Sequence, residues 1–206
     1  MIPQIKKAKE YFYEKKYKEA LEIFENCQEL YYSGLCSLLL KDEQKAKDYF
    51  EKSCSYSPSS QWGLAVLDLI HLKRPKKRPS FFQTRAFLEI YISLFIENGL
   101  VEWAENMVSM CDTFYLSNPE SYKFIARALF ANGYFDLAMT FCEKSLKLFY
   151  VDPEAFLILS QCHYLKGNLG EALDCVNRIH ALISDYYPTI LFRDVLKKEI
   201  AKKYAS

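Results

Sequence analysis

The sequence PESYKFIARALFANGYFDLA at residues 119–138 returns as PEAFLILSQCHYLKGNLGEA at residues 153–172. The two stretches begin 34 residues apart and place a proline, a glycine and an alanine at matching positions. Three sets of residues share this period: Gly99, Gly133 and Gly167; Ala104, Ala138 and Ala172; Pro119 and Pro153. A period of about 20 to 50 residues is typical of proteins built from stacked supersecondary units.

Each repeat predicts two amphipathic helices joined by a turn. Apolar residues recur at helical spacing in four segments, 122–131, 135–149, 156–166 and 169–183. Gly133 and Gly167 fall where the first helix must end, and glycine adopts the left-handed conformation of such a turn at little cost. The prolines that open each stretch suit the first turn of a helix, and Asn118 and Asp152 before them are the expected N-caps. The repeating unit is therefore a helical hairpin.

These residues resemble the tetratricopeptide repeat (TPR), a helix-turn-helix family with a period of about 34 residues. The unit at 153–186 matches the family's order of large and small residues through Phe156, Leu159, Ser160, Gly167, Leu169, Ala172, Val176 and Ile179. The unit at 119–152 supplies Tyr122, Ile125, Ala126, Gly133, Phe135, Ala138, Cys142 and Ser145. The unit at 85–118 supplies Leu88, Tyr91, Ile92, Phe95, Gly99, Ala104, Val108 and Cys111.

The amino-terminal part carries the same pattern with altered spacing. Ala20 and Ala46 lie 26 residues apart, and Ala46 and Ala104 lie 58 apart. The first interval is too short for a full repeat, and the second leaves room for one extra helix. We place that helix at 59–73, before a basic loop whose two prolines forbid helix continuation.

The resemblance implies an all-α fold, an α-solenoid of stacked TPR-like hairpins with about twelve helices. Four sections are expected: two hairpins at 1–58, the extra helix and basic loop at 59–80, three hairpins at 81–186, and a carboxyl-terminal capping helix at 187–206. The capping helix should seal the last apolar face and turn four lysines outward: Lys197, Lys198, Lys202 and Lys203.

Composition excludes several classes of protein. Half of the residues are hydrophobic, so the chain can bury a core and is not intrinsically disordered. Lys and Arg total 27 against 26 Asp and Glu, so no bulk positive field favours nucleic acid. Neither a signal peptide nor an apolar run of roughly 18 residues is present, which predicts no membrane span and a cytoplasmic protein.

The first helices of stacked hairpins line a concave groove, and residues four apart on a helix share one side. Three rows face away from the predicted core, namely Glu89, Ser93 and Ile96; Lys123, Arg127 and Phe130; and Leu157, Gln161 and Tyr164. We call these nine residues the first-helix stripe and interpret them as the partner-binding groove. Its two cations suit a carboxylate-bearing segment, and Phe130 and Tyr164 offer apolar anchors. The alternative for any single one of these residues is that it is an ordinary solvent-exposed position with no role in binding.

The basic loop is a second candidate contact. Its residues are Lys73, Arg74, Lys76, Lys77 and Arg78. They suit an acidic partner, a phosphate backbone or a nuclear-import receptor, which would make the protein nuclear. The alternative is that the loop is only a solvent-exposed linker between helices, stiffened by its prolines, and binds nothing. No aromatic residues are interleaved, so the loop is a poor platform for single-stranded nucleic acid.

No motif for phosphoryl transfer, zinc proteolysis or acyl transfer is present. We therefore expect no enzyme, no cofactor, no metal site and no small-molecule substrate. The resemblance implies a protein–protein interaction scaffold or assembly subunit that binds a peptide or helix of one or more proteins in its groove. One alternative is a secretion or assembly chaperone, which would release its client. An RNA-binding helical-repeat protein is another, and the neutral charge counts against it.

Overall fold

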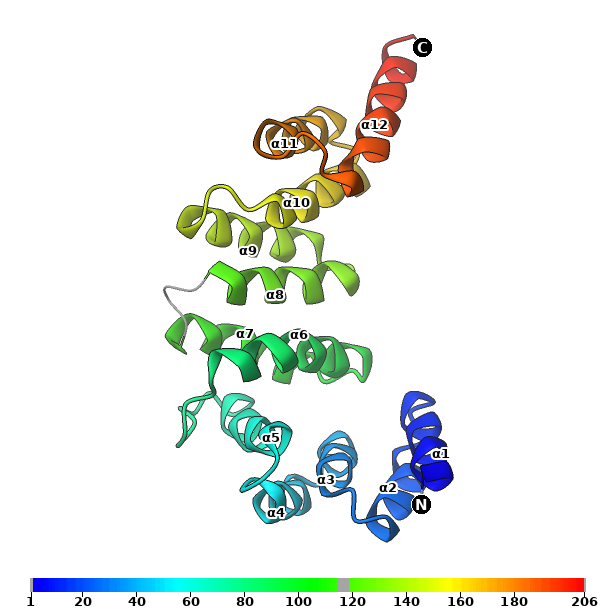
Figure 1. Cartoon of the computed structure of the whole chain (residues 1–206), viewed down its shortest axis with the longest axis vertical. Coiled ribbons are helices and arrows are strands. Elements are labelled where there is room, and N and C mark those ends of the chain that lie inside the picture. Colours follow the sequence, from blue (N-terminus) through cyan, green and yellow to red (C-terminus); the bar gives the residue numbers. More distant parts are fainter. Residues whose placement is uncertain (1, 115–118, 206) are drawn as a thin grey trace. The chain divides into compact units, whose positions relative to one another are not determined.

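The part of the chain that the structure describes forms twelve α-helices and no strand (Figure 1). The structure is a computed structural model that describes residues 2–114 and 119–205. These residues divide into unit 1, with residues 2–87 and 94–114, and unit 2, with residues 88–93 and 119–205. The predicted all-α fold of helical hairpins is confirmed, and the four predicted sections stay predictions.

Unit 1 begins with two helical hairpins. They pair α1 (Ile2–Tyr13) with α2 (Tyr17–Asn26), and α3 (Leu30–Leu39) with α4 (Glu43–Ser53). The chain turns within them at Lys15 and Lys41, whose φ angles of 61° and 64° lie in the left-handed region. A residue with a side chain adopts this conformation at a cost of roughly 1–2 kcal/mol. Because neither turn uses glycine, the glycine spacing could not reveal these two repeats.

Three further helices follow, namely α5 (Pro58–Leu69), α6 (Phe81–Glu97) and α7 (Val101–Phe114). The extra helix predicted at 59–73 is α5, and it packs against both α3 and α4, as the first helix of another hairpin would. It begins at Pro58 because the Ser57 hydroxyl accepts a hydrogen bond from the Ser60 amide, 3.2 Å away. Helix α6 begins with a capping box between Ser80 and Gln83.

The centre of unit 1 depends on one aromatic ring. Phe50 of α4 is fully buried, and its ring lies against the backbones of α3 at Gly34 and α5 at Gly63. A Cβ atom at Gly34 would come within 2.5 Å of the ring, and one at Gly63 within 2.7 Å. Both glycines lie inside helices, where they lower helix propensity. Their contribution is that they let the Phe50 ring approach the helix backbones closely.

Unit 2 contains the regular repeats. Its hairpins pair α8 (Pro119–Ala131) with α9 (Phe135–Leu148), and α10 (Pro153–Leu165) with α11 (Leu169–Leu182). Gly133 and Gly167 turn the chain with φ angles of 83° and 78°, as predicted. The Asp152 carboxylate caps α10 by accepting hydrogen bonds from the Glu154 and Ala155 amides. The predicted cap Asn118 lies outside the described residues.

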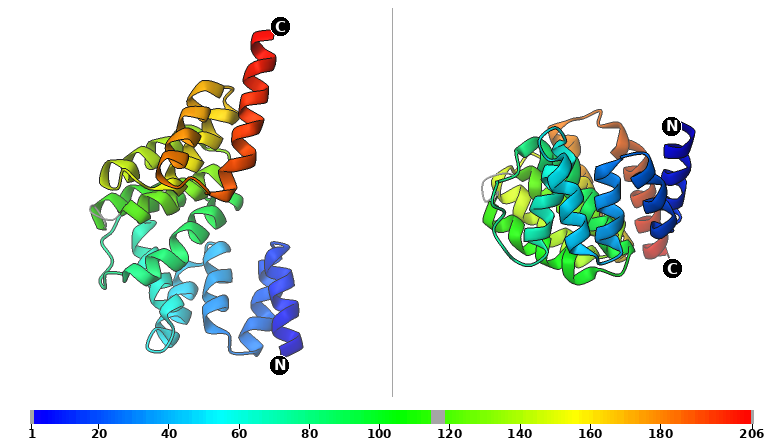
Figure 2. Two further views of the ribbon diagram at one scale, coloured as in Figure 1. Left: turned by 45° about the horizontal axis from the view of Figure 1, so that its top comes forward. Right: turned by 90° about the horizontal axis from the view of Figure 1, so that it is seen from below.

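Helix α12 (Tyr187–Ala205) covers the last hairpin and extends past the end of α11 (Figure 2). Leu196 is fully buried against Ala172 and Val176 of α11, and Phe192 packs beside it. The four lysines predicted to face outward are all exposed. This helix is therefore the expected cap of the last apolar face.

We expect Gly34→Ala to destabilise the protein, because its methyl group would overlap the Phe50 ring. Overpacking of this kind costs about 1–3 kcal/mol, which urea denaturation followed by circular dichroism would measure. The matched control is Gly170→Ala in α11, where an added Cβ meets nothing within 4 Å. It should be neutral or raise the free energy of unfolding. Equal losses for the two variants would contradict the packing described for Phe50.

Candidate functional site

Charged residues of the first-helix stripe form one network in unit 2. Lys123 Nζ lies 2.9 Å from Asp152 Oδ2 and 3.1 Å from Glu154 Oε2. Arg127 donates from Nη1 to Glu154 Oε1 at 2.6 Å, and from Nη2 and Nε to Glu89 Oε2 at 2.6 and 2.9 Å. The network thus joins α6, α8 and the amino-terminal end of α10.

The network is partly shielded from water, and the pKa values of Lys123 and Glu154 are shifted within it. The side chains of Lys123 and Asp152 are only 12% and 6% exposed. Burial alone would lower the pKa of Lys123, but hydrogen bonds to Asp152 and Glu154 outweigh it, so the pKa is raised. Burial would likewise raise the pKa of Glu154, but Lys123 and Arg127 lower it below the usual carboxyl value. Lys123 and Glu154 are therefore both ionised at neutral pH.

Both cations of the stripe are engaged inside the protein. The network contains two cations, Lys123 and Arg127, and three carboxylates, Glu89, Asp152 and Glu154. An acidic partner segment would have to compete with those carboxylates, which already make short, charge-assisted hydrogen bonds. The network instead holds three successive first helices in one arrangement.

All nine residues of the stripe are partly exposed, whereas residues between them, such as Ile125, Ala126 and Leu129, are buried. Phe130 packs its ring against Phe135, with centroids 5.7 Å apart. Tyr164 meets Phe192 of α12 edge-on, at 5.5 Å, so the capping helix covers part of this anchor. Eight of the nine residues belong to unit 2, and Ile96 belongs to unit 1.

The sequence pattern predicted both cations and one of their acceptors, Glu89, on the stripe, but not the other two acceptors. Asp152 was predicted only as an N-cap, and its carboxylate serves both as that cap and as the acceptor for Lys123. Glu154 was not singled out. The available signal was the repeat itself, because Asp152 and Glu154 open the first helix of the repeat that follows Lys123 and Arg127.

The basic loop is held against unit 1 at specific points. Pro75 and Pro79 are buried, and the Lys76 amide donates to Asp68 Oδ2 at 3.4 Å. The five basic residues of the loop are all exposed. The side chains are therefore accessible, as a contact with an acidic partner would require.

A family model described as tetratricopeptide repeat matches residues 33–60, which span α3, α4 and the start of α5. The chain carries a tetratricopeptide repeat. The resemblance inferred from the 34-residue period is thus confirmed, and the matched segment lies in the irregular amino-terminal part. A comparison with curated proteins finds no match at the level of sequence.

Solved structures of tetratricopeptide repeat proteins are similar to this chain at low identity. The first TPR of Spaghetti (RPAP3), bound to an HSP90 peptide, is 17% identical, with a TM-score of 0.49 over 58% of this chain and 94% of its own. The carboxyl-terminal part of a TPR protein from Cytophaga hutchinsonii is 18% identical, with a TM-score of 0.49 over 93% of this chain and 69% of its own.

Within the described residues, no helix combines the length and the apolar character needed to cross a membrane.

We expect Glu154→Gln to destabilise the protein at neutral pH by about 1 kcal/mol, because a half-exposed ion pair of this kind contributes on that scale. The folded-state pKa of Glu154 is lowered, so its contribution is present above the ordinary carboxyl pKa of 4.5. It is lost as the pH falls through the lower folded value. Urea denaturation at pH 7 and pH 3 should show the difference between wild type and variant shrinking in acid.

The control is Glu22→Gln in α2, which removes an exposed carboxylate that has no ion pair among the described residues. It should change the unfolding free energy little at either pH. A difference for Glu154→Gln that stays constant between the two pH values would contradict the ion-pair assignment.

Proposed function

We propose that this protein is a non-catalytic scaffold or assembly subunit that binds a segment of another protein on the first-helix stripe. Tetratricopeptide repeats mediate protein–protein interaction, and the chain carries one at residues 33–60. The observation that supports the stripe as the site is the ion network. The network fixes three successive first helices before any partner binds. Docking therefore costs the conformational entropy of the partner segment, but not that of the stripe.

The contacts would come from the half-exposed residues around the network rather than from the network itself. Lys123 and Arg127 already have carboxylate partners, so their role is to hold the surface. Leu157 and Gln161 on α10 and Phe130 on α8 offer apolar and amide groups beside it. A peptide or helix with apolar anchors and polar flanks fits that composition.

The test is quantitative co-purification from cells that naturally express the protein, followed by mass spectrometry. The variant Leu157→Arg/Gln161→Arg places two long cations on the stripe and leaves the ion network intact. We expect the variant to capture at least about 90% less of the partner than the wild type does. Two long cations at the contact would cost several kcal/mol of binding free energy. Circular dichroism should show unchanged helix content.

The matched control, Thr140→Arg/Asn177→Arg, adds the same two cations at exposed positions on the second helices α9 and α11. It should retain the partner. Loss with the control and retention with the stripe variant would place binding on another surface. Recovery of RNA without protein would overturn the scaffold proposal.

A further inference from the structure

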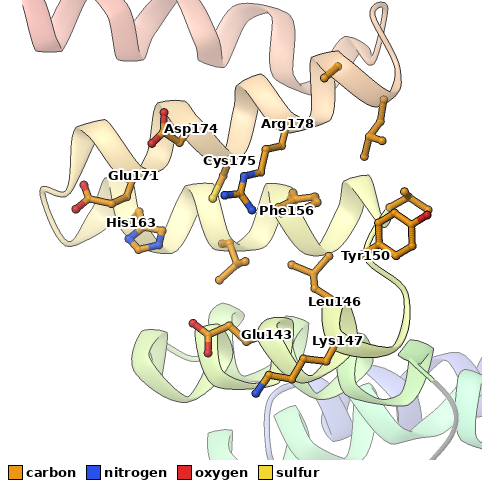
Figure 3. A pocket seen from close by; sticks show the side chains of 14 residues that line it. Glu143, Leu146, Lys147, Tyr150, Phe156, His163, Glu171, Asp174, Cys175 and Arg178 are labelled. Carbon is orange, nitrogen blue, oxygen red and sulfur yellow. The ribbon is translucent and has the colours of Figure 1, made fainter.

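A groove on the opposite, second-helix side of unit 2 is not part of the first-helix stripe. Helices α9 and α11 form its walls and α10 forms its floor (Figure 3). It encloses about 790 Å³, which is room for several side chains. Its lining is mainly apolar, with Leu146, Phe156 and Leu182 among the residues that form it.

The groove changes in chemical character along its length. Tyr150 lines one end, near the end of α11 at Leu182, and Glu143, Glu171 and Asp174 line the other (Figure 3). None of these three carboxylates is in a salt bridge within the described residues. His163 lies at the same end, and its Nδ1 atom is buried without a hydrogen-bond partner in the part of the chain described.

Two cations lie between the apolar end and the acidic end. Lys147 projects from α9, and Arg178 projects from α11 over the Phe156 ring, 5.7 Å from its centroid. Read along α11 from its carboxyl-terminal end, the groove is therefore apolar, then basic, then acidic. A ligand that complements it should be apolar, then acidic, then basic.

Helix α12 carries that complementary order on its exposed face. Tyr187, Leu191 and Val195 are 74%, 65% and 43% exposed, although they are large apolar residues at a four-residue spacing. Asp194 lies beside them, and Lys198 and Lys202 continue the same face. The opposite face holds Leu196 and packs on α11. A capping helix that only sealed the last hairpin would need no apolar residues on its outer face.

The two surfaces also match in length. Leu182 and Glu171 lie 11 residues apart on α11, and Tyr187 and Lys198 lie 11 residues apart on α12. Eleven helical residues span about 16 Å. An antiparallel alignment of α12 along α11 therefore sets Tyr187 at the apolar end and Lys198 level with Glu171 at the acidic end. Asp194 then lies level with Cys175, between Arg178 and Asp174.

We propose that the protein forms a two-fold homodimer in which α12 of each copy lies antiparallel to α11 in the groove of the other. Each subunit supplies one helix and one groove, so the same contact is made twice and the assembly closes. The dimer covers the outer face of α12 and neutralises the unpaired carboxylates. It uses the second-helix side, so the first-helix stripe stays free for a partner.

Size-exclusion chromatography with light scattering, at protein concentrations from about 1 to 100 μM, tests the proposal. The wild type should have the mass of a dimer at the upper concentrations. Glu171→Lys/Asp174→Lys in the groove should be monomeric, as should Lys198→Glu/Lys202→Glu on the helix. Each reversal sets like charges against one another in both contacts, and we expect at least a tenfold weaker association.

Mixing the two charge-reversed variants provides the decisive control. In the mixed dimer both contacts again join opposite charges, so the dimer mass should return. Lys197→Glu, at an exposed position off this face of α12, should leave the wild-type dimer intact. A wild type that is monomeric throughout, or a dimer that survives both reversals, would overturn the proposal. Partner capture through the stripe is measured separately and does not depend on either result.

Discussion

Close approach of neighbouring helices at small residues is the constraint on which this structure depends. The alanines that mark the second helices, Ala20, Ala46, Ala138 and Ala172, have no exposed surface. At Ala172 the approach is close enough for the Ser160 hydroxyl on α10 to donate to the backbone carbonyl on α11, at 2.8 Å. A larger side chain there would separate the helices and remove that buried hydrogen bond.

The sequence was enough to predict helices in both units, but not the positions of the first turns of unit 1. Glycine and proline recur in unit 2, and each has one local meaning there, a turn or a helix start. In unit 1 the turns fall on Lys15 and Lys41, whose left-handed conformation follows from surrounding packing rather than from their own preference. The order of large and small residues, with alanines 26 residues apart, pointed to these hairpins instead.

Periodicity identified which residues face outward but not which of them touch. It set Lys123 and Arg127 on the groove side, as observed, because a helix fixes the direction of each side chain along its own axis. Pairing with Asp152 and Glu154 depends on the distance between successive first helices, which no single repeat encodes. The two sides of unit 2 thus differ: ion pairs span the first-helix side, whereas Glu143, Glu171 and Asp174 in the groove have no salt bridge within the described residues.

The left-handed turns have a consequence for the lifetime of the folded chain. Among the described residues, all four side-chain-bearing residues with positive φ lie in unit 1, namely Lys15, Gln28, Lys41 and Leu72. At roughly 1 kcal/mol or more apiece, they raise the energy of the amino-terminal hairpins. Repeat arrays are stabilised largely by contacts between neighbours, so fraying begins where local energy is highest. Proteolytic turnover of the native protein would then start from its amino-terminal hairpins.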